Sequence, residues 1–130
     1  MTPLIKTTGL KMHFVISRTF TGKPKRLLKA VDGIDLTIHK GETFGLVVES
    51  GCGKTTVGRT LVRLYEPTAG SILYNGTDIA RLGTKALVPY RRKLQMIFQD
   101  PYASLDPRMT VADSIAESLQ ETDMSKKDQR

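Results

Sequence analysis

The chain has 130 residues, 39% of them hydrophobic, which suffices for one domain with a modest core. No apolar run approaches the roughly 20 residues of a membrane-spanning helix, and residues 1–9 lack the charged-then-apolar layout of a secretory signal. A single cysteine, Cys52, excludes an internal disulfide and a zinc cluster. We therefore expect a protein of the cytoplasm.

The net charge of +7 is concentrated at the start of the chain. Residues 1–30 contain seven basic residues and no acid, whereas residues 31–130 contain thirteen of each sign. The seven are Lys6, Lys11, Arg18, Lys23, Lys25, Arg26 and Lys29. This segment is either a solvated loop or a surface for anionic lipid headgroups or an acidic partner. Nucleic-acid binding is disfavoured, because no aromatic-rich surface or DNA-reading motif accompanies the charge.

The first third of the chain predicts strands. Residues 4–16 have strand-like stretches, and the basic segment 18–29, with its glycine and proline, predicts a loop or a hairpin connection. Apolar and polar side chains alternate over residues 34–38, which indicates a half-buried strand, and residues 39–42 predict a turn. Residues 44–48 form a continuous apolar run, typical of a parallel strand buried on both faces.

A helix and a tight turn follow. Apolar residues at i, i+4 and i+7 predict a helix with one apolar stripe over residues 54–64, ended by Pro67 and Gly70. Residues 71–74 predict a short strand, and the Asn75-Gly76 pair is a strong signal for a tight turn.

The remainder predicts mixed structure. Residues 78–93 favour a partly helical segment that Pro89 interrupts, and residues 94–98 predict another apolar strand. Residues 111–119 predict a short helix. Residues 125–128 resemble a capping box, a signal for a helix start, although only two residues follow. This end is interpreted either as a polar tail or as a point where a larger protein continues.

The strongest motif is a phosphate-binding loop between the predicted strand 44–48 and the predicted helix 54–64. It reads Ser50, Gly51, Cys52, Gly53, Lys54, Thr55. Its glycines allow successive N–H groups to point into one hollow, and the helix N-terminus adds partial positive charge. Lys54 can reach the β- and γ-phosphates of a nucleoside triphosphate such as ATP, and the Thr55 hydroxyl can ligate Mg²⁺.

One residue departs from the full motif G-x-x-x-x-G-K-[ST], because Val48 stands where the first glycine belongs. Valine is β-branched and prefers an extended backbone. Two outcomes stay open: the N–H groups of residues 50–55 still form the cradle with weaker affinity, or the loop entry is displaced and binding is largely lost.

Together with a further run, this loop resembles the ATP-binding subunit of ABC transporters, in the oligopeptide/dipeptide import branch. The matching runs are residues 29–34, 40–43, 49–56, 58–70 and 94–111, the last reading LQMIFQDPYASLDPRMTV. That last run is more specific than the phosphate loop alone, which many NTPase families share.

The resemblance implies an α/β fold with a P-loop NTPase-like parallel sheet core and an N-terminal antiparallel β subdomain, incomplete at the C-terminus. Residues 1–130 would then be the N-terminal part of an ABC-type nucleotide-binding domain. Within it, residues 1–43 would be mostly antiparallel β, 44–70 the phosphate-loop strand, loop and helix, 71–111 strands and the Q-loop region, and 112–130 the start of a helical subdomain.

The resemblance also assigns roles to individual residues. Lys54 and Gln99 would be catalytic, and Thr55 and Gln99 would meet Mg²⁺. Residues 100–108 would lie where the subunit meets its membrane-embedded partner. His13 or Phe14 would lie near the adenine, with a core side chain as the alternative role. The nucleotide-binding set would be Phe14, Glu49, Ser50, Gly51, Cys52, Gly53, Lys54, Thr55 and Thr56.

Several family elements are absent from the sequence: the LSGGQ-type signature, the apolar run ending in Asp-Glu (Walker B), and the switch histidine. The family hydrolyses ATP between two ATP-binding subunits and energises transport through transmembrane permease subunits. By resemblance, the chain would lie peripherally on the cytoplasmic side of the membrane. We expect this chain alone to hydrolyse little or no ATP.

Two alternatives remain open. One is an inactive, truncated ABC ATPase fragment with no transport role. The other is a different phosphate-loop protein such as a small kinase or GTPase, for which no N-K-x-D or D-x-x-G motif is present.

The Val48 hypothesis is testable by substitution. We expect Val48→Gly to bind Mg-ATP more tightly than the unsubstituted chain, because glycine restores the backbone freedom at the loop entry. Titration calorimetry of both chains measures the change, and equal affinities would refute the hypothesis.

Overall fold

The computed structural model describes residues 2–47, 49, 51, 53–100 and 106–119. The chain divides into two compact units, Met1–Leu87 and Val88–Arg130, and each is described by itself. This division differs from the four segments that the resemblance implied, which stay a prediction.

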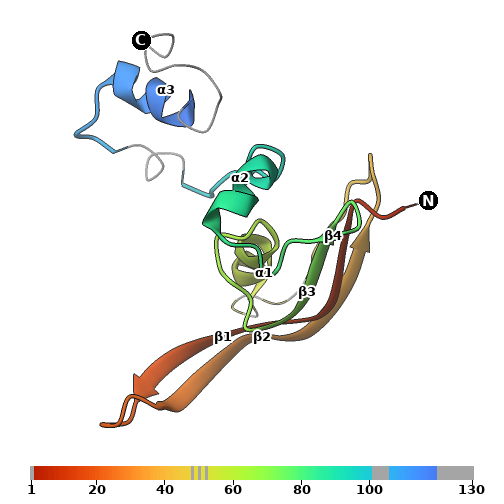
Figure 1. Ribbon diagram of the computed structural model, residues 1–130, viewed down its shortest axis with the longest axis vertical. Helices are drawn as coiled ribbons and strands as arrows, with labels where there is room; N and C mark the ends of the chain where they lie inside the picture. The colour runs from red at the N-terminus through yellow and green to blue at the C-terminus, as the bar shows by residue number, and fades with distance from the viewer. Residues whose placement is uncertain (1, 48, 50, 52, 101–105, 120–130) are drawn as a thin grey trace. The chain divides into compact units, whose positions relative to one another are not determined.

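The first unit contains a four-stranded antiparallel sheet (Figure 1). Its strands are β1 (Ile5–Arg18), β2 (Pro24–Ile38), β3 (Ala69–Tyr74) and β4 (Thr77–Asp78), in the order β2-β1-β3-β4. The basic segment 18–29 is therefore a hairpin, whose connection is only residues 19–23. The predicted antiparallel β subdomain at the N-terminus is confirmed.

Local signals place the edges of this sheet correctly. Burial alternates along residues 34–38 of β2, as the sequence predicts. Asn75 and Gly76 both have positive φ, 47° and 82°, and connect β3 to β4 with Tyr74 paired to Thr77. Two consecutive residues with positive φ are typical of the tight hairpin turn that Asn-Gly favours.

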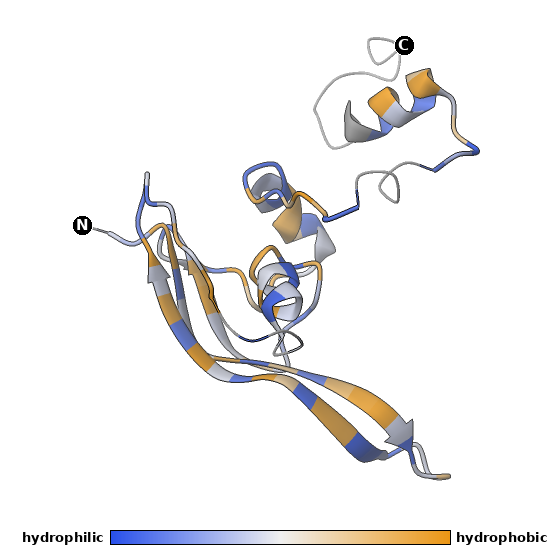
Figure 2. Cartoon of the chain, turned by 180° about the vertical axis from the view of Figure 1, so that it is seen from behind, coloured by the Kyte–Doolittle hydropathy of each residue, from blue (hydrophilic) through white to orange (hydrophobic). Residues whose placement is uncertain are grey.

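The core of the described residues lies where helix α1 (Lys54–Leu61) contacts β1 and β2. Its fully or nearly buried apolar residues are Leu10, Val31, Val57, Ile72, Ile79, Ala80 and Leu87. Figures 1 and 2 show α1 on one side of the sheet. An apolar stripe on the helix and one face of the sheet thus share a small core.

Helix α1 ends earlier than predicted, at Leu61 rather than residue 64. Arg63 has a φ of 58°, in the left-handed region, and stops the helix there. Its buried guanidinium donates to the carbonyl oxygens of Ile79 at 2.9 Å and Leu82 at 3.1 Å. These bonds hold the chain after β4 and explain why α1 ends early. Leu64, beyond the end of the helix, is therefore 55% exposed.

Two predicted strands are not formed among the described residues. Residues 44–47 and 94–98 have no regular secondary structure, and Val47 and Ile97 are 92% and 96% exposed. A buried parallel strand needs hydrogen-bonding neighbours on both sides. No described strand pairs with either run, so the apolar sequence alone does not make them strands.

The remaining helices are α2 (Thr84–Arg91) and α3 (Val111–Leu119). The prediction that Pro89 breaks the helical segment is wrong, because Pro89 lies in the last turn of α2 and removes only one backbone donor there. Helix α3 has the predicted bounds. The Thr110 hydroxyl accepts from the Asp113 N–H at 3.1 Å and caps its start. The predicted capping box at residues 125–128 lies outside the described residues.

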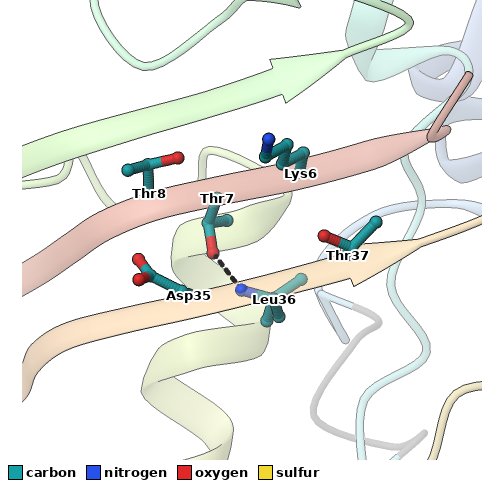
Figure 3. A pocket seen from close by; sticks show the side chains of 6 residues that line it. All are labelled: Lys6, Thr7, Thr8, Asp35, Leu36 and Thr37. Atoms are coloured by element: carbon teal, nitrogen blue, oxygen red, sulfur yellow. Dashed lines mark hydrogen bonds between the residues drawn. The ribbon is translucent and has the colours of Figure 1, made fainter.

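A bulge in β1 depends on one buried hydroxyl. Between the pairs Thr7–Leu36 and Leu10–Ile34, β1 contains two residues and β2 only one. The Thr7 hydroxyl accepts from the Leu36 N–H at 3.0 Å, as Figure 3 shows. It also donates to the Ile34 carbonyl at 3.1 Å. The side chain thereby replaces ladder bonds that the bulge disrupts.

We expect Thr7→Val to destabilise the chain by about 1–3 kcal/mol, because Thr7 is 2% exposed and valine leaves its two backbone partners unsatisfied. Thr7→Ser keeps the hydroxyl and is the control. Urea unfolding followed by circular dichroism measures both, and equal losses for the two variants would contradict this role of the hydroxyl.

Candidate functional site: the phosphate loop

The phosphate loop enters helix α1 through two residues in the left-handed region. Gly51 has a φ of 85° and Gly53, the N-cap, has a φ of 93°. The Val57 N–H donates to the Gly53 carbonyl at 2.9 Å, which closes the first helical turn. The helix therefore begins at Lys54, as the motif predicts.

The position of Gly53 is fixed by its contact with β2. A Cβ atom at Gly53 would collide with the carbonyl oxygen of Ala30. Only glycine fits this close approach, and its positive φ is strained for any other residue. The sheet thus determines where the loop turns into α1.

The N-terminus of α1 is suited to an anion. Its first turn contains no acidic residue, and Gly53 provides no side-chain cap. In a helix that begins here, the N–H groups of Lys54, Thr55 and Thr56 have no partner within the helix. The partial positive charge of the helix end favours phosphate oxygens at these N–H groups.

The Lys54 side chain turns back along the loop. Its ammonium donates to the backbone carbonyl of Glu49 at 3.0 Å, and both Lys54 and Thr55 are exposed. Lys54, Thr55 and the backbone of Gly51 and Gly53 therefore come from one continuous turn at the open end of α1. The nucleotide and Mg²⁺ contacts expected of these residues stay predictions.

Three residues of the predicted site, Val48, Ser50 and Cys52, lie outside the described residues. Gln99 is described and exposed, but it belongs to the second unit. That Gln99 and Thr55 coordinate the same Mg²⁺ ion stays a prediction.

The region expected to meet the membrane partner is described only in part, since residues 101–105 lie outside the described residues. At its end, the Arg108 guanidinium donates to both carboxylate oxygens of Asp106, at 3.0 and 2.9 Å. These hydrogen bonds lower the pKa of Asp106.

The two candidates for an adenine contact have defined partners. The Phe14 ring meets the Tyr65 ring edge-on, with centroids 5.4 Å apart, and the Arg59 guanidinium donates to the Tyr65 hydroxyl at 2.9 Å. His13 contacts Asp32 through its ring and Thr68 through its backbone N–H. Phe14 thus packs on the segment after α1, in keeping with the alternative of a core side chain.

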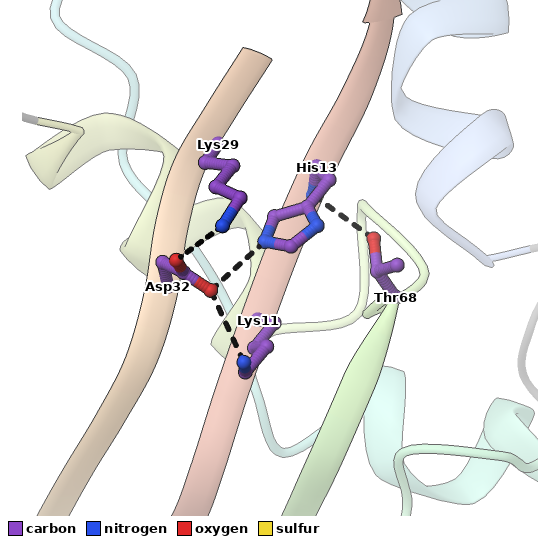
Figure 4. A network of polar contacts seen from close by, with 5 residues as sticks. All are labelled: Lys11, His13, Lys29, Asp32 and Thr68. Atoms are coloured by element: carbon purple, nitrogen blue, oxygen red, sulfur yellow. Dashed lines mark hydrogen bonds and ion pairs between the residues drawn. The ribbon is translucent and has the colours of Figure 1, made fainter. Parts of the chain in front are cut away.

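A charged network joins β1 to β2 next to this point (Figure 4). The Asp32 carboxylate lies 3.1 Å from Lys29 Nζ, 3.2 Å from Lys11 Nζ and 3.1 Å from His13 Nε2. Hydrogen bonds from Lys29, then Lys11 and His13, lower the pKa of Asp32 from 3.8 to about 2. Asp32 is the only acid among the residues shown in Figure 4. Its carboxylate, on β2, contacts Lys11 and His13 on β1 and so links the two strands electrostatically.

Neither this network nor the buried Arg63 is predicted from the sequence. Asp32 is the first acid after thirty-one residues without one, which is a signal for a local counter-charge. Arg63 carries no comparable signal, because its carbonyl partners are brought to it only by the fold.

The fold is that of an ATP-binding cassette. The dimeric structure of the bacterial ABC transporter cassette MJ0796 matches with a TM-score of 0.70 at 22% identity, covering 96% of this chain and 52% of that one. A post-hydrolysis structure of the same cassette bound to ADP and Pi matches with a TM-score of 0.71 at 21% identity, with the same coverage.

The chain belongs to the ABC transporter family, which matches residues 31–130. It is 55% identical to the putative oligopeptide transport ATP-binding protein YkfD of Bacillus subtilis over 91% of this chain, and 55% identical to OppF of the same organism over 89%. Both are oligopeptide transport ATP-binding proteins by name. The chain spans about a third of their length, 34% and 36% respectively.

Among the described residues, no helix has the length and apolar character needed to cross a membrane.

The Asp32 network predicts a pH dependence of stability. The pKa of Asp32 is lower in the folded chain than its ordinary value of 3.8, so its contribution is present above about pH 4. It is lost as the pH falls through about 2. We expect the stability difference between the unsubstituted chain and Asp32→Asn to be constant near neutral pH and to shrink over this interval.

Urea unfolding at several pH values measures this difference. The matched control is Glu66→Gln, an exposed carboxylate on the same unit. A difference for Asp32→Asn that does not change between pH 5 and pH 2 would contradict the network's role.

Proposed function

We propose that this chain binds Mg-ATP as part of the ATP-binding subunit of a peptide importer. One observation carries the proposal: Lys54 and Thr55 lie exposed at an uncapped, acid-free N-terminus of α1, behind a glycine that no other residue can replace. The peptide-transport names of the relatives support the importer class.

Each residue of the loop has a distinct task. The N–H groups at the start of α1 would hold phosphate oxygens. The Lys54 ammonium would exchange the Glu49 carbonyl for a phosphate oxygen. This exchange costs little, because one hydrogen bond replaces another.

The residues present fit a magnesium ion as well as the nucleotide. The exposed Thr55 hydroxyl is the hard oxygen ligand that Mg²⁺ accepts beside phosphate oxygens, and Gln99 would supply a second oxygen. When bound, Mg²⁺ neutralises charge on the phosphates. Near the base, His13 or Phe14 would provide the aromatic face.

Hydrolysis and transport are assigned to the assembly. The chain would pair with a second ATP-binding subunit and with transmembrane permease subunits, and nucleotide binding would energise import through them. Peripheral attachment to the cytoplasmic side of the membrane follows from these partners.

We expect Mg-ATP to raise the thermal unfolding temperature of the chain, because a ligand that binds only the folded state stabilises it. At about 100 times the Kd, the gain is about 2.7 kcal/mol. We expect Lys54→Ala to remove most of this shift. Differential scanning fluorimetry or calorimetry measures both.

The matched control is Lys40→Ala, which removes an exposed lysine from the turn before the loop. It should keep the full Mg-ATP shift. An equal shift in Lys54→Ala and Lys40→Ala would sink the proposal, and so would the absence of any shift in the unsubstituted chain.

A further inference from the structure

The far end of the β1–β2 hairpin extends beyond the rest of the sheet. Pairing of β1 with β3 stops at Lys11 and Ala69, whereas pairing of β1 with β2 continues to Arg18 and Pro24. Figure 1 shows this part as a two-stranded ribbon that projects away from α1. We call residues 15–28 the hairpin extension.

The hairpin extension exposes apolar side chains from both strands and the turn. Val15 and Leu27 are directly paired across the ribbon, and neither is covered. The exposed apolar residues are Val15 (40%), Ile16 (57%), Phe20 (109%), Leu27 (49%) and Leu28 (52%). Figure 2 shows apolar and hydrophilic segments next to one another along this end of the ribbon. Several exposed apolar side chains on one projecting ribbon favour an interaction site.

Phe20 is held at the outermost point by an ordered turn. The Thr19 N–H donates to the Lys23 carbonyl at 2.7 Å, and the Gly22 N–H donates to the Thr19 carbonyl at 2.8 Å. The Thr19 hydroxyl also accepts from the Lys23 N–H at 3.1 Å. These bonds order the backbone around Phe20, and the Phe20 side chain is fully exposed.

The same surface is strongly basic. Its positive residues are Arg18, Lys23, Lys25 and Arg26, all exposed, and no acid occurs among residues 1–30. Asp32 neutralises Lys29 and Lys11 but reaches no residue of the hairpin extension in any contact of the described part. The hairpin extension therefore joins exposed apolar groups to four positive charges.

We propose that the hairpin extension binds the surface of an anionic lipid membrane, with Phe20 at the level of the headgroups. Aromatic rings favour the membrane interface, and nearby lysines and arginines attract anionic headgroups. The acidic face of a protein partner would also match the positive charge. A projecting tip with apolar groups around both strands, however, suits immersion in a lipid interface better than contact with a flat protein surface. This inference does not rest on nucleotide binding.

The first test measures binding of the chain to vesicles of phosphatidylglycerol and phosphatidylcholine by flotation, without nucleotide. We expect binding to phosphatidylglycerol vesicles that weakens with salt, and little to phosphatidylcholine alone. Lys23→Gln/Lys25→Gln should weaken it about 25-fold, at about fivefold for each charge. Lys40→Gln/Lys85→Gln changes the net charge equally and should weaken it far less.

Equal weakening by the two lysine pairs would overturn the proposal in favour of diffuse charge attraction. The absence of binding to phosphatidylglycerol vesicles would also overturn it, and would leave an acidic protein as the partner. Phe20→Ser should weaken binding, whereas Val47→Ser, at a 92% exposed apolar residue outside the hairpin, should not. An equal effect of Phe20→Ser and Val47→Ser on vesicle binding would contradict the proposal that the tip of the hairpin contacts the membrane.

The second test uses the absence of tryptophan from the sequence. Phe20→Trp places the chain's single tryptophan at the tip, and its emission should shift to the blue when phosphatidylglycerol vesicles are added. Thr77→Trp, on the exposed β4 of the same unit, is the control and should not shift. An unshifted tip tryptophan on vesicle-bound protein would overturn the insertion of Phe20.

Discussion

The contact between the Ala30 carbonyl and the Gly53 backbone is the constraint on which the phosphate loop depends. It leaves no space for a Cβ atom, so the loop turns into α1 at the one point that β2 allows. Two residues beyond Ala30, Asp32 contacts Lys11 and His13 of β1 and links the two strands by charge beside this contact. The antiparallel hairpin of β1 and β2 thus determines the geometry with which the loop enters α1.

That hairpin has two ends with different properties. At the near end, it packs on α1 and supports the phosphate loop. At the far end, it leaves the sheet and exposes basic and apolar groups together. In our proposals both ends would attract anions, but by different means. The loop would use backbone N–H groups and one lysine, whereas the hairpin extension would use side chains around an ordered turn.

The sequence predicts correctly those features that neighbouring residues decide. The Asn75-Gly76 turn, the alternation over residues 34–38, the helix at Val111–Leu119 and the start of α1 at Lys54 all follow from local chemistry. The sequence does not predict features that depend on contacts between residues far apart in the chain. The apolar runs at residues 44–47 and 94–98 carry the composition of buried strands, yet no described strand pairs with them. Arg63 ends α1 by means of carbonyls that lie sixteen and more residues away.

The sequence by itself determined the family and the residues of the phosphate loop, because a cradle for phosphate needs glycine, lysine and threonine in one short, contiguous order. Only the tertiary structure decided that Gly53 is irreplaceable, that Asp32 joins β1 to β2, and that Phe14 packs on Tyr65. It also showed that the basic segment projects as an ordered hairpin. These features depend on pairing between residues far apart in the chain, which no local pattern encodes.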